Sequence, residues 1–174
     1  MKSIRFAAIA TMALLTGAAP ALADAPTLLG TFKEWSAYTT GSGNAKVCYA
    51  LSQPKSVDPK KAARDPIYFL ISDWPGRKAK AEPEVVPGYA YKDGSVVDVR
   101  VGADKFQMFT KNDGDSGGAW VQNPADETRL IDSMKRGSQI IVTGTSERGT
   151  LTKDTYSLAG ISAALDKIHA SCGM

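Results

Sequence analysis

The sequence predicts a mainly β protein, an antiparallel sandwich or barrel that carries two short helices. Short runs of β-branched and aromatic residues recur along the chain, and clusters of turn-forming residues separate them about every 8–12 residues. Two segments instead show the apolar spacing of amphipathic helices, and the second of them lies at the C-terminus. The 174 residues contain no internal repeat, low-complexity segment or second domain boundary, so we expect a single domain.

The strands of the first half follow from their residue types. Trp35 and Tyr38 suit a half-buried strand, and the turn-forming residues after them end it. In the next strand Cys48 and Ala50 share a face, because alternate side chains point the same way. A polar, proline-rich loop is expected next, and the IYFLIS run after it is short and apolar enough for a core strand. The expected strands are residues 28–38, 46–52 and 67–72, with the loop at 54–66.

The second half adds hairpin signals and both helices. Asp93-Gly94 predicts a two-residue hairpin between neighbouring strands, and the charged stretch at 77–84 before it is expected to be an exposed loop or a hairpin end. Valines that alternate with charged residues then indicate a strand with one dry face. Helical spacing of apolar residues, with Gly137 at the end of the first segment, predicts two helices. The expected strands are 85–91, 95–101, 105–110, 119–122, 139–145 and 150–158, and the helices are 124–136 and 162–171.

The amino terminus is typical of a secretory signal peptide over residues 1–23. Lys2 and Arg5 give it a positive start, an apolar stretch follows, and a small-x-small cleavage motif ends at Ala23. The apolar stretch is shorter than the ~20 residues that a membrane-spanning helix needs, and no later stretch is long enough. We therefore expect cleavage after Ala23 and an exported domain of residues 24–174, in the periplasm or outer envelope or secreted, with no membrane span. The alternative is an uncleaved N-terminal anchor.

The two cysteines, Cys48 and Cys172, are expected to form a disulfide. Export would place them in an oxidising compartment, where pairing is the default. The bridge would tie the C-terminal helix to an early strand and close a loop of about 125 residues, which the chain-entropy model values at roughly 4–5 kcal/mol. The alternatives are two free thiols or a metal pair, for which His169 is the one imidazole in the sequence.

The charge balance argues against nucleic acid as a partner. Without Lys2 and Arg5, 19 basic residues face 18 acidic ones, so the exported chain carries a net charge of about +1. Its basic residues form pairs rather than runs. Sequence-independent binding to nucleic acid or to an anionic membrane needs clustered cations. We expect neither as a partner.

The string GDSGG at residues 114–118 is the strongest enzymatic motif in the chain. It surrounds the nucleophile of trypsin-like serine proteases, in which a histidine and an aspartate precede the serine. Here the one histidine, His169, follows Ser116 along the chain. A dyad with Lys105 or Lys111 is the remaining route to an activated serine, and the spacing favours neither lysine. The run of turn-forming residues favours an exposed, mobile hairpin loop, so we expect no catalytic residues and keep a secreted serine hydrolase using Ser116 as an alternative.

No metal and no cofactor are expected. Several turn residues offer oxygen ligands, and the run that starts at Asn112 resembles the beginning of a calcium loop. Position 12 of that loop is Asn123 rather than the glutamate that closes an EF-hand, so solvated turn acids are the better interpretation. His169 is expected to be a surface or half-buried residue at a helix end, where a cation suits the helix dipole. The acids concerned are Asp93, Asp104, Asp113 and Asp115.

A set of short segments spread over residues 28–172 carries a family resemblance. They are Trp35, KVCYA at 46–50, IYFL at 67–70, Gly88-Tyr89, SERGT at 146–150, DTYSLAG at 154–160 and AAL at 163–165. These segments resemble the invasion-associated locus B (IalB) family of exported bacterial proteins. The resemblance implies an immunoglobulin-like β-sandwich in the periplasm or outer envelope, a link to host-cell invasion in pathogenic members, and no catalytic residues. Some members have a further cysteine where this chain has Tyr38-Thr39, so their second disulfide is not expected.

The sequence therefore favours a non-enzymatic exported envelope protein that acts by protein–protein contact, in host-cell invasion or in envelope upkeep. Its partners would be envelope or host-cell proteins. Binding residues concentrate on loops that a rigid scaffold holds, so two polar loops are candidate contact sites. The candidate residues are Asp115, Ser116, Gly117, Glu147 and Arg148. The alternative is a periplasmic chaperone-like or inhibitor-like protein that binds through an exposed sheet edge.

Overall fold

The strands of the described chain join in one antiparallel sheet. The computed structural model describes residues 25–60 and 62–174. Its eleven strands are hydrogen-bonded in the order β1-β2-β3-β5-β6-β9-β8-β7-β10-β11-β4. Their bounds are β1 (Thr27–Phe32), β2 (Trp35–Thr40), β3 (Val47–Ser52), β4 (Ser56–Asp58), β5 (Tyr68–Trp74), β6 (Ala79–Val86), β7 (Val96–Val101), β8 (Asp104–Asp113), β9 (Ser116–Trp120), β10 (Gln139–Thr145) and β11 (Leu151–Ser157). Two short 3-10 helices are η1 (Gly43–Ala45) and η2 (Pro75–Arg77).

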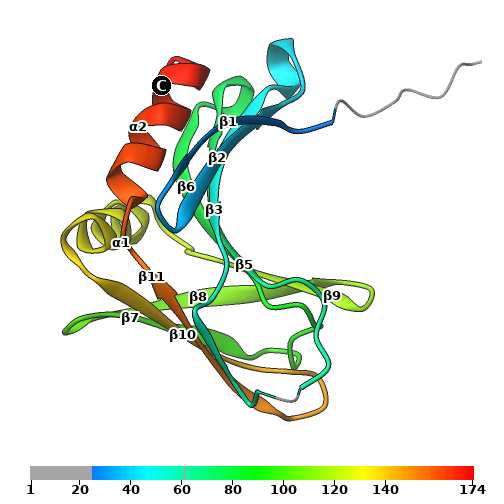
Figure 1. Cartoon of the computed structure of the whole chain (residues 1–174). Helices are drawn as coiled ribbons and strands as arrows, with labels where there is room; N and C mark the ends of the chain where they lie inside the picture. Colours follow the sequence, from blue (N-terminus) through cyan, green and yellow to red (C-terminus); the bar gives the residue numbers. More distant parts are fainter. Residues whose placement is uncertain (1–24, 61) are drawn as a thin grey trace, which may run out of the picture.

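The sheet folds over on itself and forms both layers of a sandwich. The halves β1-β2-β3-β5-β6 and β9-β8-β7-β10-β11-β4 are joined through two register pairs between β6 and β9. Aromatic rings connect their inner faces, because Phe69 packs edge-on against Trp35 at 6.3 Å and against Tyr156 at 5.9 Å. Figure 1 shows the first half above the second, with both helices on one side. The expected antiparallel β-sandwich is confirmed, and one continuous sheet supplies the two layers that an immunoglobulin domain builds from separate sheets.

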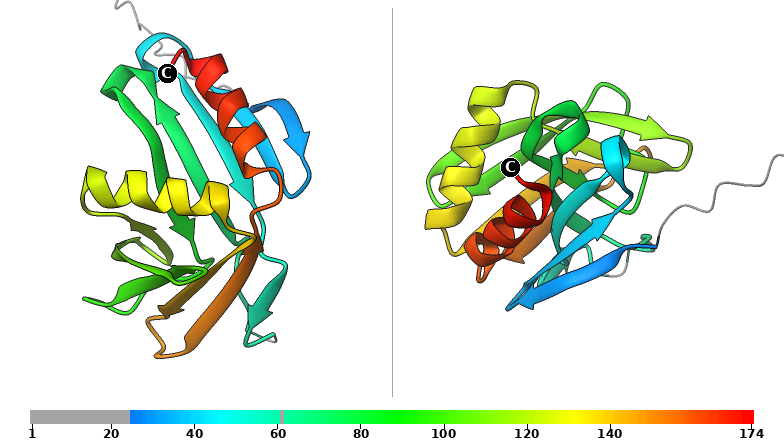
Figure 2. Two further views of the ribbon diagram at one scale, coloured as in Figure 1. Left: turned by 90° about the vertical axis from the view of Figure 1, so that its left-hand side faces the viewer. Right: turned by 90° about the horizontal axis from the view of Figure 1, so that it is seen from above.

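The two helices cover the open side of this folded sheet, as Figure 2 shows. The first, α1 (Pro124–Arg136), begins where the Asn123 side chain accepts a hydrogen bond from the Asp126 N–H. It ends at Gly137, as predicted. The second, α2 (Ile161–Cys172), buries the apolar positions whose spacing predicted it, and it packs on β1, β2, β3 and β5. The buried residues of α2 are Ile161, Ala164, Leu165, Ile168 and Cys172.

The C-terminal helix is fastened to the sheet by covalent and polar contacts. Cys48 on β3 and Cys172 at the end of α2 form the expected disulfide, with a sequence separation of 124. Beside it, the Lys46 ammonium donates a hydrogen bond to the Ser171 carbonyl. These contacts bring the last turn of α2 onto the third strand.

Four expectations about the strands and loops differ in detail from the structure. The first strand is a hairpin, β1 and β2, that turns at Lys33 with φ 54°. The charged stretch at 77–84 is expected to be an exposed loop or a hairpin end. Its first two residues do end the β5–β6 turn, but the rest belongs to β6, since a strand with one solvated face tolerates charges. Asp93-Gly94 is a turn, but its flanks do not form a hairpin, because β6 pairs with β5 and β9 while β7 pairs with β8 and β10. Part of the 54–66 loop also forms the edge strand β4.

The predicted signal peptide, residues 1–23, lies outside the described residues. Within the described ranges, none of the helices has the length and hydropathy needed to cross a membrane.

Replacing both cysteines with alanine (C48A/C172A) is expected to lower the free energy of unfolding by about 2–5 kcal/mol, because the bridge restricts the unfolded chain. Urea denaturation followed by circular dichroism measures the change. The wild-type protein in reductant is the matched control and should show a similar shift, whereas the variant should not respond to reductant. Equal midpoints for all four samples would contradict a stabilising role.

Candidate functional site

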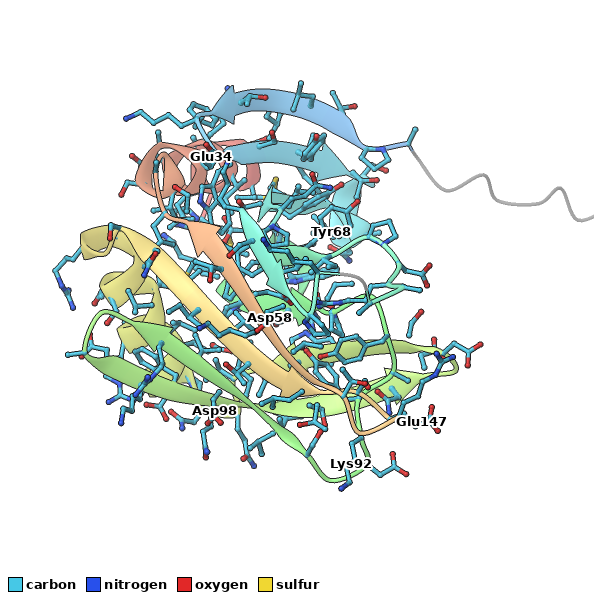
Figure 3. The ribbon with its side chains drawn as sticks, turned by 60° about the horizontal axis from the view of Figure 1, so that its bottom comes forward. Glu34, Asp58, Tyr68, Lys92, Asp98 and Glu147 are labelled. Atoms are coloured by element: carbon cyan, nitrogen blue, oxygen red, sulfur yellow. A yellow bond between two sulfur atoms is a disulfide. The ribbon has the colours of Figure 1, made fainter. Side chains whose placement is uncertain are left out.

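Four segments that are distant in sequence meet at one end of the sandwich, which we call the loop end. They are residues 62–65, residues 88–90, the β8–β9 turn and the turn at 146–150 after β10, and they line a cavity of about 590 Å³. Backbone hydrogen bonds join the segments, from the Asp65 N–H to the Gly88 carbonyl and from the Glu147 N–H to the Ala90 carbonyl. Figure 3 shows Glu147 and Lys92 together at this end of the molecule.

A buried ion pair anchors the loop end. The Arg64 guanidinium donates two hydrogen bonds to the Asp154 carboxylate, at 2.8 and 2.6 Å, and the two side chains are only 4% and 3% exposed. Its third bond, from Nε, goes to the Pro87 carbonyl at 2.8 Å. Burial alone would lower the pKa of Arg64, but the hydrogen bonds and charge of Asp154 raise it, so the guanidinium stays charged. Because the Arg64 guanidinium is hydrogen-bonded to Asp154 on β11, Arg64 holds the 62–65 segment onto that strand.

Three tyrosines and one asparagine complete the rigid base of the loop end. The Tyr89 hydroxyl lies 2.6 Å from the Thr152 hydroxyl, and the Tyr89 ring lies under the Arg64 guanidinium at 5.0 Å. The Asn112 side chain accepts from the Tyr91 N–H and donates to the Tyr91 carbonyl, both at 2.8 Å. Burial raises the pKa of Tyr89, Tyr91 and Tyr156, so all three phenols remain neutral and act as packing groups.

The loop end gathers three of the candidate contact residues. Asp115, Glu147 and Arg148 line the same cavity although two different turns carry them. All three are exposed, and within residues 25–60 and 62–174 their side chains have no hydrogen-bond or ion-pair partner. The charged groups therefore face solvent at the rim of the cavity, on a base of buried hydrogen bonds.

The GDSGG segment forms the hairpin that the sequence predicts, with a tight turn between β8 and β9. Asp113 pairs with Ser116, so Gly114 and Asp115 form a two-residue turn, and Gly114 takes φ 56°. Ser116 is exposed and already lies in β9. Gly117 is half-buried, and a Cβ there would come within 2.6 Å of the Tyr89 carbonyl oxygen, so this position needs glycine for packing.

His169 has a partner that the sequence did not reveal. Its Nδ1 lies 2.6 Å from Oδ2 of Asp73 on β5, and Asp73 is fully buried. The other carboxylate oxygen of Asp73 accepts a hydrogen bond from the Ala81 N–H at 2.8 Å. The pair fastens α2 to β5 and β6. Ser116 is not part of it, because the β8–β9 hairpin and α2 lie on opposite sides of the molecule (Figure 1).

The oxygen ligands considered for calcium do not form a metal site in the part of the chain that the structure describes. Asn112 is fully used by the Tyr91 backbone, and Asp104 accepts a hydrogen bond from the Ser133 hydroxyl at 2.6 Å. Across the described residues, no group of three or more histidine, cysteine, aspartate or glutamate side chains is suited to a metal ion.

The fold and the site define a disulfide-bonded, two-layer β protein with a rigid base under polar surface loops. The family model described as "Invasion associated locus B (IalB) protein" matches residues 35–169, and the chain belongs to this family. Among solved structures, the chain is similar to the crystal structure of invasion associated protein b from Bartonella henselae, with a TM-score of 0.57 and 14% identity over 83% of this chain and 98% of that one. This likeness shows a shared fold. No curated protein matches the sequence.

Sequence reasoning missed the residues that build the site, chiefly Arg64, Tyr89 and Asp154. Arg64 lies in a polar stretch that carries no motif, and its partner is 90 residues away. Tyr89 and Asp154 both belong to segments that carry the family resemblance, which was the available signal for their importance.

Arg64→Met is expected to lower the free energy of unfolding by about 3–5 kcal/mol, because it leaves the Asp154 carboxylate buried without a partner. The double variant R64M/D154L should recover most of that loss. Urea denaturation measures both. Glu34→Gln is the control, since its pair with Lys55 is exposed and should be worth less than about 1 kcal/mol. A loss in R64M no larger than in E34Q would contradict the anchoring role.

Ser116 is expected to remain unlabelled by a fluorophosphonate probe. It lies away from the His169–Asp73 pair, and among the described residues its hydroxyl has no hydrogen-bond partner that could act as a general base. In-gel fluorescence of the wild-type protein and S116A should be identical. Labelling that disappears in S116A would restore the hydrolase alternative.

Proposed function

We propose that this chain is a non-enzymatic exported envelope protein that binds protein partners through the loop end. One observation carries the proposal: turns from four distant parts of the sequence converge on one cavity, and charged residues without partners form its rim. Loops held by a rigid scaffold are the usual place for recognition. The base of this site is a network of buried hydrogen bonds, which fixes the rim before a partner arrives and so reduces the entropy that binding costs.

Family membership supports a cellular location for the proposed binding. IalB membership supports a place in the bacterial envelope, with export by the predicted signal peptide and cleavage after Ala23. The name of the Bartonella relative supports a role in host-cell invasion where the organism is a pathogen, and envelope upkeep is the corresponding role in a free-living one. The partners are then envelope or host-cell proteins.

A free sheet edge favours a second candidate, the chaperone-like or inhibitor-like protein. Strand β1 has six residues and, among residues 25–60 and 62–174, pairs only with β2, so its outer backbone groups have no strand partner there. Leu28 on this strand is 54% exposed. An extended segment of another protein can add to such an edge. Strand β4 at the other edge has only three residues and offers far less backbone.

Photocrosslinking in the native envelope tests the loop end. A benzoylphenylalanine residue in place of Arg148 is expected to yield a discrete crosslinked product, because this position lies on the rim of the cavity. The same residue in place of Lys167, which is exposed on α2 away from the loop end, is the control. Equal crosslinking from both positions, or none from Arg148, would contradict the proposal. A product from position 28 on β1 alone would favour the sheet-edge candidate.

A further inference from the structure

A row of apolar side chains crosses the outer face of the sheet, away from both helices. Val96 on β7, Phe109 on β8 and Trp120 on β9 are direct register partners across three neighbouring strands. Val96 is 48% exposed and Phe109 is 42% exposed, and the rings of Phe109 and Trp120 lie 6.0 Å apart. We call these three residues the aromatic row. An apolar group of this kind on an uncovered face is a candidate contact surface.

The indole of Trp120 lies over a glycine of its own strand. A Cβ at Gly118 would lie 2.2 Å from the Trp120 ring, so the ring occupies the space directly over this residue. Trp120 is only half-buried, so part of the indole remains accessible to a partner. The last glycine of the GDSGG motif, Gly118, thus makes room for the Trp120 ring, a role that differs from the packing role of Gly117.

The aromatic row ends at a carboxylate without a basic partner. Glu84 on β6 is the register partner of Trp120, whose side chain hydrogen-bonds to it. Burial raises the pKa of Glu84, and the nearby negative charge of Glu82 raises it further. In the described ranges, Glu84 makes no ion pair, while Arg77 pairs with Glu82 at 3.4 Å. Lys111 on the same face lies opposite Gly118 and does not bond to Glu84.

We propose that the aromatic row and Glu84 form a docking surface for a basic segment of a partner protein. An arginine or lysine of that segment lies against the accessible part of the Trp120 indole and pairs with Glu84, and an apolar neighbour covers Phe109 and Val96. Charge complementarity selects this partner, because an acidic or purely apolar surface would bury Glu84 further without neutralising it. The accessible part of the indole adds cation–π attraction for the same group. This surface lies on a sheet face, separate from the loop end, so the inference does not depend on the function proposed above.

A synthetic peptide of alternating arginine and leucine tests the surface, with the same peptide carrying glutamate in place of arginine as its counterpart. The protein, expressed as the full chain and purified, is titrated with each peptide by isothermal calorimetry. The arginine peptide is expected to bind and the glutamate peptide is not. Glu84→Gln and Phe109→Ser should each weaken binding by about tenfold, since one removes the charge partner and the other the apolar contact.

Glu34→Gln is the matched control, because it makes the same charge change beside the β1–β2 turn, outside both proposed contact surfaces, and should leave the affinity unchanged. Urea midpoints within the wild-type range show that each variant is folded. Equal affinity of wild type, E84Q and F109S, or no binding of the arginine peptide, would overturn the proposal. A wild-type dimer in size-exclusion chromatography that F109S abolishes would overturn it too, since the occupant would then be a second copy of the chain. None of these outcomes changes the result expected from crosslinking at Arg148. Either proposal can therefore be contradicted while the other holds.

Discussion

Contact between aromatic rings on the inner faces holds the two halves of the sheet together. Phe69 touches Trp35 from the early hairpin and Tyr156 from the last strand, so the first and last parts of the chain meet in one cluster. The Trp35 indole also donates to the Ser157 carbonyl at 3.0 Å, which fixes how the halves lie on each other. A sheet folded around such a cluster leaves one side and two ends open. The helices cover the side, and polar contacts close the ends.

Buried charged side chains lie at both ends of the sandwich. The free-energy cost of burying a charge explains why the segments around each of them adopt one arrangement. Near the disulfide, Asp73 holds His169 and the Ala81 N–H; at the loop end, Arg64 holds Asp154 and the Pro87 carbonyl. A buried charge is tolerated only when its hydrogen-bonding groups are used, so each pair accepts one arrangement of the segments around it. The two pairs therefore specify where α2 and the 62–65 segment lie, beyond what apolar burial alone would decide.

The molecule thus separates its scaffold from the surfaces that we propose for partner contact. Family membership and the likeness to the Bartonella protein account for the scaffold. The rim of the loop end and the aromatic row are surface features that can differ between relatives without disturbing it, which is how one fold supports different partners. The GDSGG motif contributes both to the surface and to the scaffold. Its turn places Asp115 on the rim, while its last two glycines fit against Tyr91 and Trp120.

The sequence by itself determined the mainly antiparallel β class and the two helices, because periodicity and capping residues are local signals. The count of two cysteines with a predicted export signal indicated the disulfide, and segments spread along the chain carried the resemblance to the family. The sequence also indicated two polar turns as contact sites. Only the tertiary structure decided that these turns share one cavity, that Arg64 and Asp73 are buried with partners, and that Val96, Phe109 and Trp120 form one row. Each of these depends on strand register and on how the sheet folds over. Strand register is decided by burial across the whole sheet, so no local pattern of residues predicts it.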